Sequence, residues 1–278
     1  MKMMHIPSLK SKRVRDVFII ILMVVCGAYR SFTHVVDTQW EDFLPSSNSL
    51  PDYCTKQDDT ARRWINVVYS STSARYQSRC SHSTRIGPDG DGGKIVCTDN
   101  IRREDCVIYS LGSRLDFEFE ISSLKQLGCA VHTFDCTVGE VNESNIPDGV
   151  HFHPWCVGGK SERKIISSDL GHTGEIGQYY PIHDIMTKLG HTRIDLLKMD
   201  IERHELAVIG SLNSRYAPEQ IVFETHLHNA YGLWQRPMTH EEWHNMWRKL
   251  AKLGYGIFSF EPNPICLCCC EWSIKMRN

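Results

Sequence analysis

The 278-residue chain lacks an excess of charge of either sign. Its 31 lysines and arginines stand against 33 aspartates and glutamates, which gives a formal net charge of −2 and an isoelectric point near 6.7. Non-specific nucleic-acid binding depends on a concentrated positive field that neutralises phosphates. The balanced charge therefore argues against a nucleic-acid partner. We also find no internal repeats.

The N-terminal apolar run is short. Residues 17–29 carry no charge and follow four basic residues between Lys10 and Arg15. The run is shorter than the roughly 17–25 residues of a typical membrane-spanning helix, and a basic stretch before such a run is typical of a secretory signal. Residues 1–30 are therefore predicted to be a cleaved signal peptide or an uncleaved signal anchor. A buried helix is the weaker alternative.

Either form of this segment would direct the rest of the chain into the secretory pathway. If it were uncleaved, the chain would be a single-pass type II membrane protein with its body in the ER or Golgi lumen; if cleaved, it would be secreted. Membrane contact is expected only through residues 1–30. Asn142, in the motif Asn142-Glu143-Ser144, fits a glycosylation acceptor in the lumen.

Twelve cysteines also fit an oxidising compartment, where they form disulfides. Four of them are close together at the C-terminal end, at positions 266, 268, 269 and 270. Such a cluster is compatible with zinc, but no partner cluster with C-x-x-C spacing exists elsewhere. Disulfides are therefore the favoured interpretation of this cluster.

After Cys106, short apolar runs alternate with stretches of helical periodicity. This is the pattern of βαβ units and a mostly parallel sheet. The sequence therefore predicts an α/β domain over residues 76–278, preceded by a polar stem or lead-in at residues 31–75. We expect strands over residues 106–111, 130–134, 164–167, 194–199 and 220–224.

Three helices are expected among these strands. Pro181 opens the first, whose apolar positions keep helical spacing until Gly190. A second, weaker helix is predicted near residues 203–212. The third begins at Thr239 with a capping box and ends at Gly254, and its tryptophans are assigned to the core.

The remaining segments are defined by glycine and proline. The glycine-rich stretch 87–93 is predicted to be a loop, because so many glycines hold neither a helix nor a strand. The chain is expected to run through residues 256–260, to turn at two prolines, and to return through residues 271–276.

One predicted strand ends at a glycine and the next at a carboxylate. In Rossmann-like cofactor sites, the turn after the first strand needs glycine, and the second strand ends in an acid that binds ribose, about 20 residues on. Here Gly112 and Ser113 end the first strand and Asp135 ends the second. These three residues are predicted to bind a cofactor. A structural turn with a capping aspartate is the alternative.

A third strand brings two more carboxylates to the same edge of the sheet. Asp200 and Glu202 follow the predicted strand at residues 194–199. Carboxylates at a strand exit are costly unless they are used. We therefore predict that Asp200 and Glu202 line the cofactor site and that Asp200 is also a catalytic candidate. The alternative is that one of them caps the following helix.

These segments resemble the animal methyltransferase-like family that carries a luminal domain, which is related to FkbM-type methyltransferases. The resemblance covers residues 85–278, with residues 85–94 similar to its glycine-rich lead-in and 198–202 to its carboxylate strand. It implies a Rossmann-like class I methyltransferase fold, with a mostly parallel seven-stranded sheet and helices on both faces. It also implies S-adenosylmethionine as the cofactor. Gly112 would then approach the methionine moiety, Asp135 the ribose, and Asp200 or Glu202 the far side of the pocket.

The sequence departs from that family at two positions. Many cofactor loops of this type have a second glycine, whereas Gly112 is followed by Ser113, Arg114 and Leu115. The acid-glycine pair of FkbM-type proteins is Glu202-Arg203 here. A catalytically silent relative that binds a partner is therefore an alternative.

Methyl transfer from a sulfonium is an in-line displacement, and a hydroxyl acceptor needs a base. Glu224, His226 and His228 follow the strand at residues 220–224 and alternate, so they would share one face. Glu224 and His226 are the catalytic candidates with Asp200. No metal is required for this reaction. A core or solvated histidine, and a divalent metal on this face, are the alternatives.

We therefore expect an S-adenosylmethionine-dependent methyltransferase of the secretory pathway. A glycan or another small hydroxyl compound is the expected acceptor, by analogy alone. The other enzyme class that fits is a Golgi glycosyltransferase, in which Asp200 and Glu202 would hold a metal and a sugar nucleotide.

Overall fold

The structure is a computed structural model that describes residues 69, 70, 72–103, 105–168, 171–202, 204–227, 238–263, 266 and 269–277. The predicted signal segment lies outside these residues, as do the stem up to residue 68, Arg203 and His228. Among the described helices, none is both long and apolar enough to cross a membrane.

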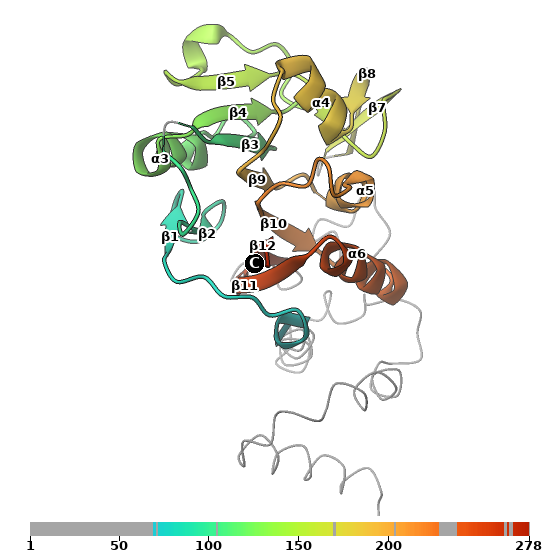
Figure 1. The fold of residues 1–278 in the computed structure, drawn as a ribbon. Helices are drawn as coiled ribbons and strands as arrows, with labels where there is room; N and C mark the ends of the chain where they lie inside the picture. Colours follow the sequence, from blue (N-terminus) through green and yellow to red (C-terminus); the bar gives the residue numbers. More distant parts are fainter. Residues whose placement is uncertain are drawn as a thin grey trace, which may run out of the picture. The chain divides into compact units, whose positions relative to one another are not determined.

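Seven strands form a central sheet (Figure 1). Their bounds are β3 Val107–Leu111, β4 Ala130–Phe134, β5 Val150–His153, β9 Leu196–Met199, β10 Gln220–His226, β11 Tyr255–Pro262 and β12 Cys269–Met276. The order across the sheet is β11-β12-β10-β9-β3-β4-β5. Neighbours from β10 to β5 are parallel, whereas β12 lies antiparallel between β10 and β11. The mostly parallel seven-stranded sheet is confirmed.

Helices pack on both faces of this sheet, as predicted (Figure 1). One face carries α3 Glu118–Leu127, and the other carries α4 Ile182–Leu189, α5 Glu205–Ser211 and α6 His240–Lys252. On the first face, Phe119 packs in one apolar cluster with Ile108 and Val222. On the second, the rings of Trp247 and Trp272 lie 4.7 Å apart. The tryptophans of α6 are core residues, as the helical spacing predicts.

The ends of the helices follow the predicted signals. A capping box between Thr239 and Glu242 starts α6, because the threonine hydroxyl accepts from the Glu242 N–H at 3.1 Å. Gly190 ends α4 with φ 71°, a backbone conformation that glycine adopts at low cost. These two helices are therefore confirmed, and α5 takes the place of the helix expected near residues 203–212.

One predicted strand belongs to a different sheet. Residues 164–167 lie in β7 Glu162–Ser168, which pairs antiparallel with β8 Gly171–Tyr180. Together with β6 Cys156–Val157 these strands form a separate three-stranded sheet. The assignment of residues 164–167 to the parallel sheet was wrong. The place at its edge is taken by β5, whose polar sequence VHFH gave no apolar run.

A β-hairpin lies on the α3 face of the sheet. It consists of β1 Ser83–Ile86 and β2 Lys94–Cys97, joined by the glycine-rich loop that the sequence predicts at residues 87–93. Ile86 and Val96 belong to the same apolar cluster as Phe119 of α3. The hairpin therefore covers part of the sheet that α3 leaves open.

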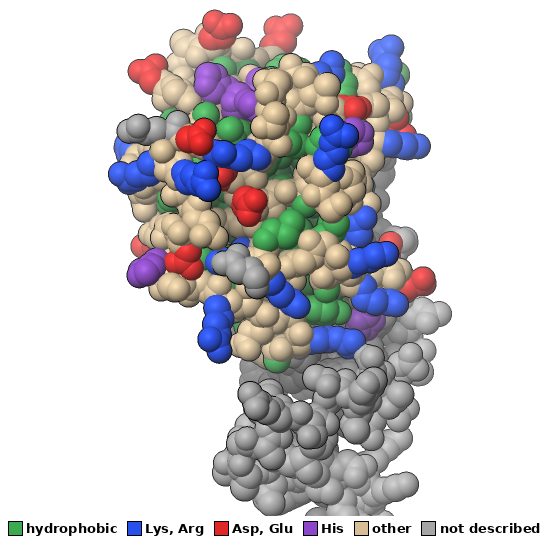
Figure 2. All heavy atoms as spheres, viewed as in Figure 1, with side chains coloured by type: hydrophobic (Ala, Val, Ile, Leu, Met, Phe, Trp, Pro, Cys, Tyr) green, Lys and Arg blue, Asp and Glu red, His purple; other side chains and the backbone are tan. Residues whose placement is uncertain are grey.

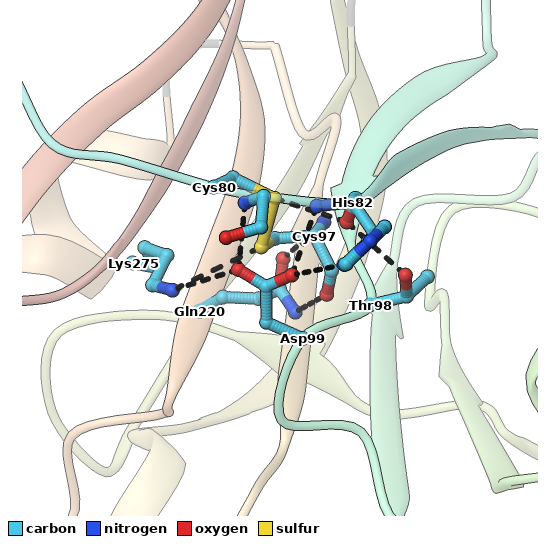
Figure 3. The surroundings of a disulfide bond; sticks show 8 residues. Cys80, His82, Cys97, Thr98, Asp99, Gln220 and Lys275 are labelled. Carbon is cyan, nitrogen blue, oxygen red and sulfur yellow. Dashed lines mark hydrogen bonds and ion pairs between the residues drawn. A yellow bond between two sulfur atoms is a disulfide. The ribbon is translucent and has the colours of Figure 1, made fainter.

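Three kinds of contact fix the base of this hairpin (Figure 3). A disulfide joins Cys80 to Cys97. The backbone N–H of Cys97 donates to the side chain of Gln220 in β10 at 2.9 Å, and the Gln220 amide donates back to the Cys97 carbonyl at 2.7 Å. Asp99 lies 3.7 Å from Lys275 of β12. Residues that β2 carries toward the site are thus held in place by strands of the main sheet.

Three further disulfides occur among the described cysteines. They join Cys106 to Cys129, Cys136 to Cys156, and Cys266 to Cys269, whereas Cys270 is a buried free thiol. The pair at the C-terminal end agrees with the prediction of a disulfide there.

Tyr69 is fully buried against Trp272, with ring centroids 5.5 Å apart. The packed core therefore reaches into the segment that the sequence assigns to the stem.

Candidate functional site

The predicted site residues lie at the carboxyl edge of the parallel strands, in two adjoining groups. One group follows β3 and β4, and the other follows β9 and β10. The first contains Gly112, Ser113 and Asp135; the second contains Asp200, Glu202, Glu224 and His226. The structure therefore brings the catalytic candidates together.

Asp135 holds the loop that follows β3. Its Oδ2 accepts hydrogen bonds from the backbone N–H groups of Ser113 (3.1 Å) and Arg114 (2.8 Å). Its Oδ1 accepts from the N–H and the hydroxyl of Thr137, at 2.9 and 2.7 Å. Both carboxylate oxygens of this buried residue are thus engaged within the protein. Asp135 shapes the loop, and its contact with a ribose stays a prediction.

The same loop lies tightly against the exit of β9. Gly112 has φ 79°, and a Cβ added there would lie 2.0 Å from the carbonyl oxygen of Asp200. The ammonium of the buried Lys198 donates to the carbonyl of Gly112. The two groups of site residues therefore meet through the backbone at Gly112.

The loop after Gly112 keeps a backbone conformation that glycine favours, although it has no second glycine. Arg114 and Leu115 have φ 50° and 64°, a left-handed region that costs a non-glycine residue roughly 1–2 kcal/mol. Glu202, next to the other departure from the family pattern, has φ 52°. The backbone thus keeps the turns that glycine would favour, although the sequence has larger residues there.

His226 is the centre of the β9–β10 group. Its Nε2 lies 3.3 Å from Oε2 of Glu224 and 3.4 Å from Oε2 of Glu202. Burial lowers the pKa of His226, but its hydrogen bond to Glu224 and the negative charges of Glu224, Glu202 and Glu205 raise it to about 10. In this state His226 is a cation and a donor, whereas the predicted role as a base needs its neutral form. Neither Asp200 nor Glu202 is the N-cap of α5, which is His204.

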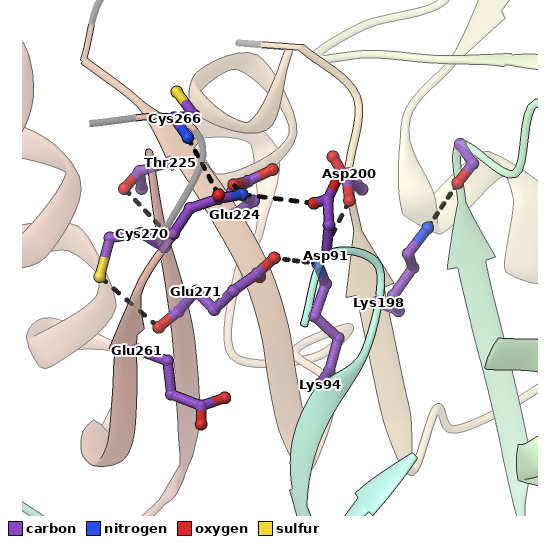
Figure 4. A network of polar contacts seen from close by, with 12 residues as sticks. Asp91, Lys94, Lys198, Asp200, Glu224, Thr225, Glu261, Cys266, Cys270 and Glu271 are labelled. Atoms are coloured by element: carbon purple, nitrogen blue, oxygen red, sulfur yellow. Dashed lines mark hydrogen bonds and ion pairs between the residues drawn. The ribbon is translucent and has the colours of Figure 1, made fainter. Parts of the chain in front are cut away.

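Lys94, at the start of β2, reaches the same edge (Figure 4). Its Nζ donates to Oε1 of Glu271 at 2.5 Å and lies 3.2 Å from Oδ2 of Asp200. Burial lowers the pKa of Lys94, but Asp200, Glu271 and Glu224 more than offset this and raise it. Burial raises the pKa of Asp200, but Lys94, Lys198 and His226 lower it to about 2. Lys94 and Asp200 are therefore charged at neutral pH.

Glu271 and the hairpin loop complete this region. Burial raises the pKa of the Glu271 carboxyl to about 8 against the attraction of Lys94, with Glu224 and Asp200 adding to the rise. The amide of Asn263 donates to Glu224 at 2.9 Å and to Asp91 of the glycine-rich loop at 3.3 Å. Figure 4 shows Lys94 of β2, Glu224 of β10 and Glu271 of β12 close to Asp200, with Asp91 of the glycine-rich loop beside them.

Several members of the site were not found from the sequence. In the sequence, Lys94 stands out only as part of the glycine-rich lead-in, and Glu271 only as the start of a predicted strand. Lys198 did carry a signal, because a lysine within an apolar strand is rarely buried without a partner. Lys94 and Glu271 carried none, since their contact spans 177 positions of the chain.

A second cluster of titratable side chains lies at the β5 side of the sheet and is called the histidine group: His132, His151, His153 and His191. Figure 2 shows histidine side chains at the surface over this end of the sheet. Nδ1 of His132 lies 3.0 Å from Nε2 of His153, and His191 contacts the hydroxyl of Tyr109 at 2.7 Å. Burial, followed by the neighbouring histidines, lowers the pKa of His132 to about 3 and of His153 to about 4. His132 and His153 are therefore neutral at pH 7.

Acid is expected to destabilise the fold through this group. A histidine with a lowered pKa stays neutral in the folded protein but takes up a proton on unfolding. Its contribution is therefore complete above pH ~6.5 and is lost as the pH falls toward 4 and then 3. We expect His132 and His153 each to lower the free energy of unfolding by about 1 kcal/mol between pH 7 and pH 5, allowing for partial exposure.

Urea unfolding at both pH values measures this effect. The wild-type chain should lose more stability on acidification than His132→Phe, which cannot take up a proton at that position. His82→Phe, at an exposed position, should behave as the wild type does. Equal losses in the wild type and in His132→Phe would show that the group does not titrate in this way.

The strand order, with β12 antiparallel between β10 and β11, together with a glycine turn after β3 and carboxylates after β9, defines a Rossmann-like class I methyltransferase fold. Residues 26–275 match a protein family described as a methyltransferase domain. This match covers most of the chain. The chain therefore belongs to the methyltransferase-domain family, which confirms the predicted resemblance to methyltransferases, while the relation to FkbM-type proteins and the luminal location stay predictions.

Curated relatives in animals agree with this assignment. The chain is 32% identical over 185 residues to the human "Probable methyltransferase-like protein 24", covering 59% of this chain and 47% of that protein. It is 29% identical over 189 residues to the rat protein of the same name, covering 62% of this chain and 48% of the relative. The chain thus spans about half the length of the curated relatives that it matches.

Solved structures show only distant similarity. A fibrillarin pre-rRNA processing protein from Methanococcus jannaschii is 8% identical, with a TM-score of 0.38, over 63% of this chain and 68% of that one. A SAM-dependent methyltransferase from Aquifex aeolicus is 13% identical, with a TM-score of 0.31, over 63% and 84% of the two chains. Scores this low carry no argument about function.

Proposed function

We propose that this protein is an S-adenosylmethionine-dependent methyltransferase that methylates a hydroxyl group of a carbohydrate or another small acceptor. The observation that carries the proposal is the shared edge at which Gly112 contacts the exit of β9. Open α/β sheets bind ligands outside the carboxyl ends of their strands. The loop after β3 and the carboxylates after β9 and β10 thus lie where a cofactor and an acceptor would meet.

The β3 loop is the part that we expect to hold the cofactor. Asp135 fixes its backbone N–H groups from one side, and the backbone of Asp200 confines Gly112 from the other. A loop held in this way needs little reordering when a ligand binds. When bound, S-adenosylmethionine supplies the methyl group for an in-line displacement. The chain's part is to align the two reactants.

The β9–β10 group is the part that we expect to face the acceptor. Asp200 and Glu224 offer carboxylate oxygens, and Glu202 is the most exposed of the three carboxylates, at 38% for its side chain. Carboxylates that accept hydrogen bonds from sugar hydroxyls would orient such an acceptor. The family match gives no support to the glycosyltransferase alternative.

We further propose that the protein acts in the secretory pathway, as a type II membrane protein or in secreted form. Four disulfides among the described cysteines support an oxidising compartment. Asn142 is exposed before the short helix η2 Glu143–Asn145, where its side chain accepts from the Ser144 N–H at 3.0 Å. An exposed acceptor of this kind is open to glycosylation.

Calorimetric titration of S-adenosylmethionine and S-adenosylhomocysteine into the chain produced in secreting cells tests both proposals. We expect a glycosylated product and a Kd on the order of micromolar. Asp135→Asn, which keeps the shape of the side chain but disturbs the loop, should weaken binding at least about tenfold. Asp148→Asn, at an exposed position, is the matched control.

The outcomes separate the alternatives. A folded protein that binds neither compound would contradict the methyltransferase proposal and favour a silent methyltransferase-like domain. Equal affinity in Asp135→Asn and the wild type would remove Asp135 from the cofactor site. A chain that is retained unglycosylated in the cytosol would contradict the proposed location alone.

A further inference from the structure

The β9–β10 group has the composition of a metal site. We call Asp200, Glu202, Glu224 and His226 the carboxylate–histidine cluster. One ligand atom from each of Asp200, Glu202 and His226 lies within 4.8 Å of the other two. Glu224 contacts the same nitrogen of His226 as Glu202 does, at 3.3 Å. Two ligands at adjacent positions of a divalent ion, with bonds of roughly 2.3–2.6 Å, would be about 3.3–3.7 Å apart, close to the separations of Glu202 and Glu224 from His226.

The cluster places more carboxylates around His226 than one imidazole nitrogen can serve. Oxygens of Glu202 and Glu224 lie 3.4 and 3.3 Å from Nε2 of His226, and this nitrogen carries at most one proton. A ligand atom of Asp200 lies within 4.8 Å of those of Glu202 and His226. Lys198 is engaged by the carbonyl of Gly112. Carboxylates held this close repel one another, so a further cation between them would stabilise this edge.

An independent observation points to a missing ligand. Next to the cluster, Glu271 is 7% exposed, and its Oε2 has no hydrogen-bond partner among the described residues. A ligand atom of Glu271 lies within 4.8 Å of one of Glu224, which belongs to the cluster. His226 is 8% exposed, and its Nδ1, on the ring edge away from the two glutamates, also lacks a partner in the described part of the chain. Buried polar atoms are nearly always paired, and each exception needs a ligand, a water or a functional reason. The polar contacts of this region are therefore incomplete.

We propose that the carboxylate–histidine cluster binds a divalent cation of the Mn²⁺ type through Asp200, Glu202, His226 and Glu224. Carboxylates with one imidazole suit such an ion better than sulfur-rich or all-imidazole sites do. The ion takes the place of the proton on Nε2 of His226, which passes to solvent. The partly exposed side chain of Glu202 gives the ion a way in.

A bound ion would also give the carboxylate–histidine cluster a role in activating the acceptor hydroxyl. A bound divalent cation polarises an oxygen ligand and favours loss of its proton. An acceptor hydroxyl on the ion would then lose its proton to solvent and take the methyl group, with S-adenosylhomocysteine as the leaving group, and no neutral histidine would be needed as base. This role rests on the proposed methyl transfer, whereas the binding of the ion does not.

Binding of Mn²⁺ to the chelator-treated full chain, without S-adenosylmethionine, tests the proposal. Calorimetry and electron paramagnetic resonance should find one bound ion. His226→Gln and Glu202→Gln should each weaken it at least tenfold, while Glu140→Gln, at an exposed position, should leave the affinity unchanged. Glu202→Gln is the decisive variant, because its partly exposed side chain makes misfolding a minor risk; circular dichroism confirms the fold of each variant.

Two results would overturn the proposal. One is the absence of Mn²⁺ binding, or binding that Glu202→Gln leaves intact. The other is loss of binding in Asp91→Asn but not in Glu202→Gln, which would place the ion at the neighbouring carboxylates Asp91, Glu224 and Glu271. S-adenosylmethionine is titrated into the metal-free chain in a separate experiment. Loss of Mn²⁺ binding alone would contradict the metal site, and loss of cofactor binding alone would contradict the methyltransferase proposal.

Discussion

Replacing Lys94 with methionine is expected to lower the free energy of unfolding by about 3–5 kcal/mol. Lys94 is 1% exposed and contacts the carboxylates of Asp200 and Glu271, at 3.2 and 2.5 Å. Methionine fills much the same volume but leaves the charged carboxylate of Asp200 and the buried side chain of Glu271 without this ammonium group. Removing one partner of a buried ion pair costs more than the pair itself contributes, because the remaining charge stays desolvated.

Urea unfolding followed by circular dichroism measures the effect. Lys125→Met, at an exposed position on α3, is the matched control and should change stability by less than about 0.5 kcal/mol. Combining Lys94→Met with Asp200→Asn removes the charge that has lost its cation, so the double variant should recover at least about 1 kcal/mol. If Lys94→Met is no less stable than the control, Lys94 does not hold this edge together.

Lys94 also explains why the glycine-rich hairpin belongs to the site. β2 is fixed at its far end by the disulfide to Cys80 and by the reciprocal hydrogen bonds with Gln220. Its near end presents Lys94 to β9 and β12. A segment that precedes the α/β core in sequence thus supplies the cation that keeps the carboxylates of the core together.

Much of the fold could be predicted because the central strands are apolar and their helices have clear ends. β3, β9 and β10 are buried along their length and appear in the sequence as apolar runs. The capping box at Thr239 and the glycine at position 190 gave the start of α6 and the end of α4. Local signals of this kind depend only on neighbouring residues.

The elements that escaped prediction lack such signals. β5 is an edge strand whose histidines are only partly buried, so it shows no apolar run. In α3, the polar residues Glu120 and Ser123 are buried next to Phe119 and Leu127, which obscures the helical pattern. Tertiary contacts decide both elements: Ser110 of β3 donates to Glu120 at 2.6 Å.

In the candidate site too, local sequence signals predicted some features, whereas tertiary contacts decide the others. Strand ends predicted Gly112, Asp135, Asp200 and Glu202 as residues of one edge, because parallel strands present their carboxyl ends together. The sequence could not show that the Asp135 carboxylate bonds to the loop, since that depends on the direction of a side chain. Nor could it show that Glu202 and Glu224 contact one nitrogen of His226.

Gly112→Ala is expected to destabilise the chain by about 2–5 kcal/mol and to abolish cofactor binding. The new methyl group would lie 2.0 Å from the carbonyl oxygen of Asp200, so the β3 loop and the exit of β9 must move apart. Overpacking of this kind costs about 1–3 kcal/mol, and an alanine with φ 79° adds about 1–2 kcal/mol.

Gly139→Ala separates the two contributions. Gly139 has φ 69°, but a Cβ there would meet no atom within 4 Å, so this variant should lose only the conformational part and bind S-adenosylmethionine normally. Urea unfolding and calorimetric titration of both variants make the comparison. If Gly112→Ala is as stable as Gly139→Ala and still binds the cofactor, the close contact between the two halves of the edge is not needed. If it fails in both respects, the spacing between the β3 loop and Asp200 is what joins the cofactor side of the edge to the carboxylate–histidine cluster.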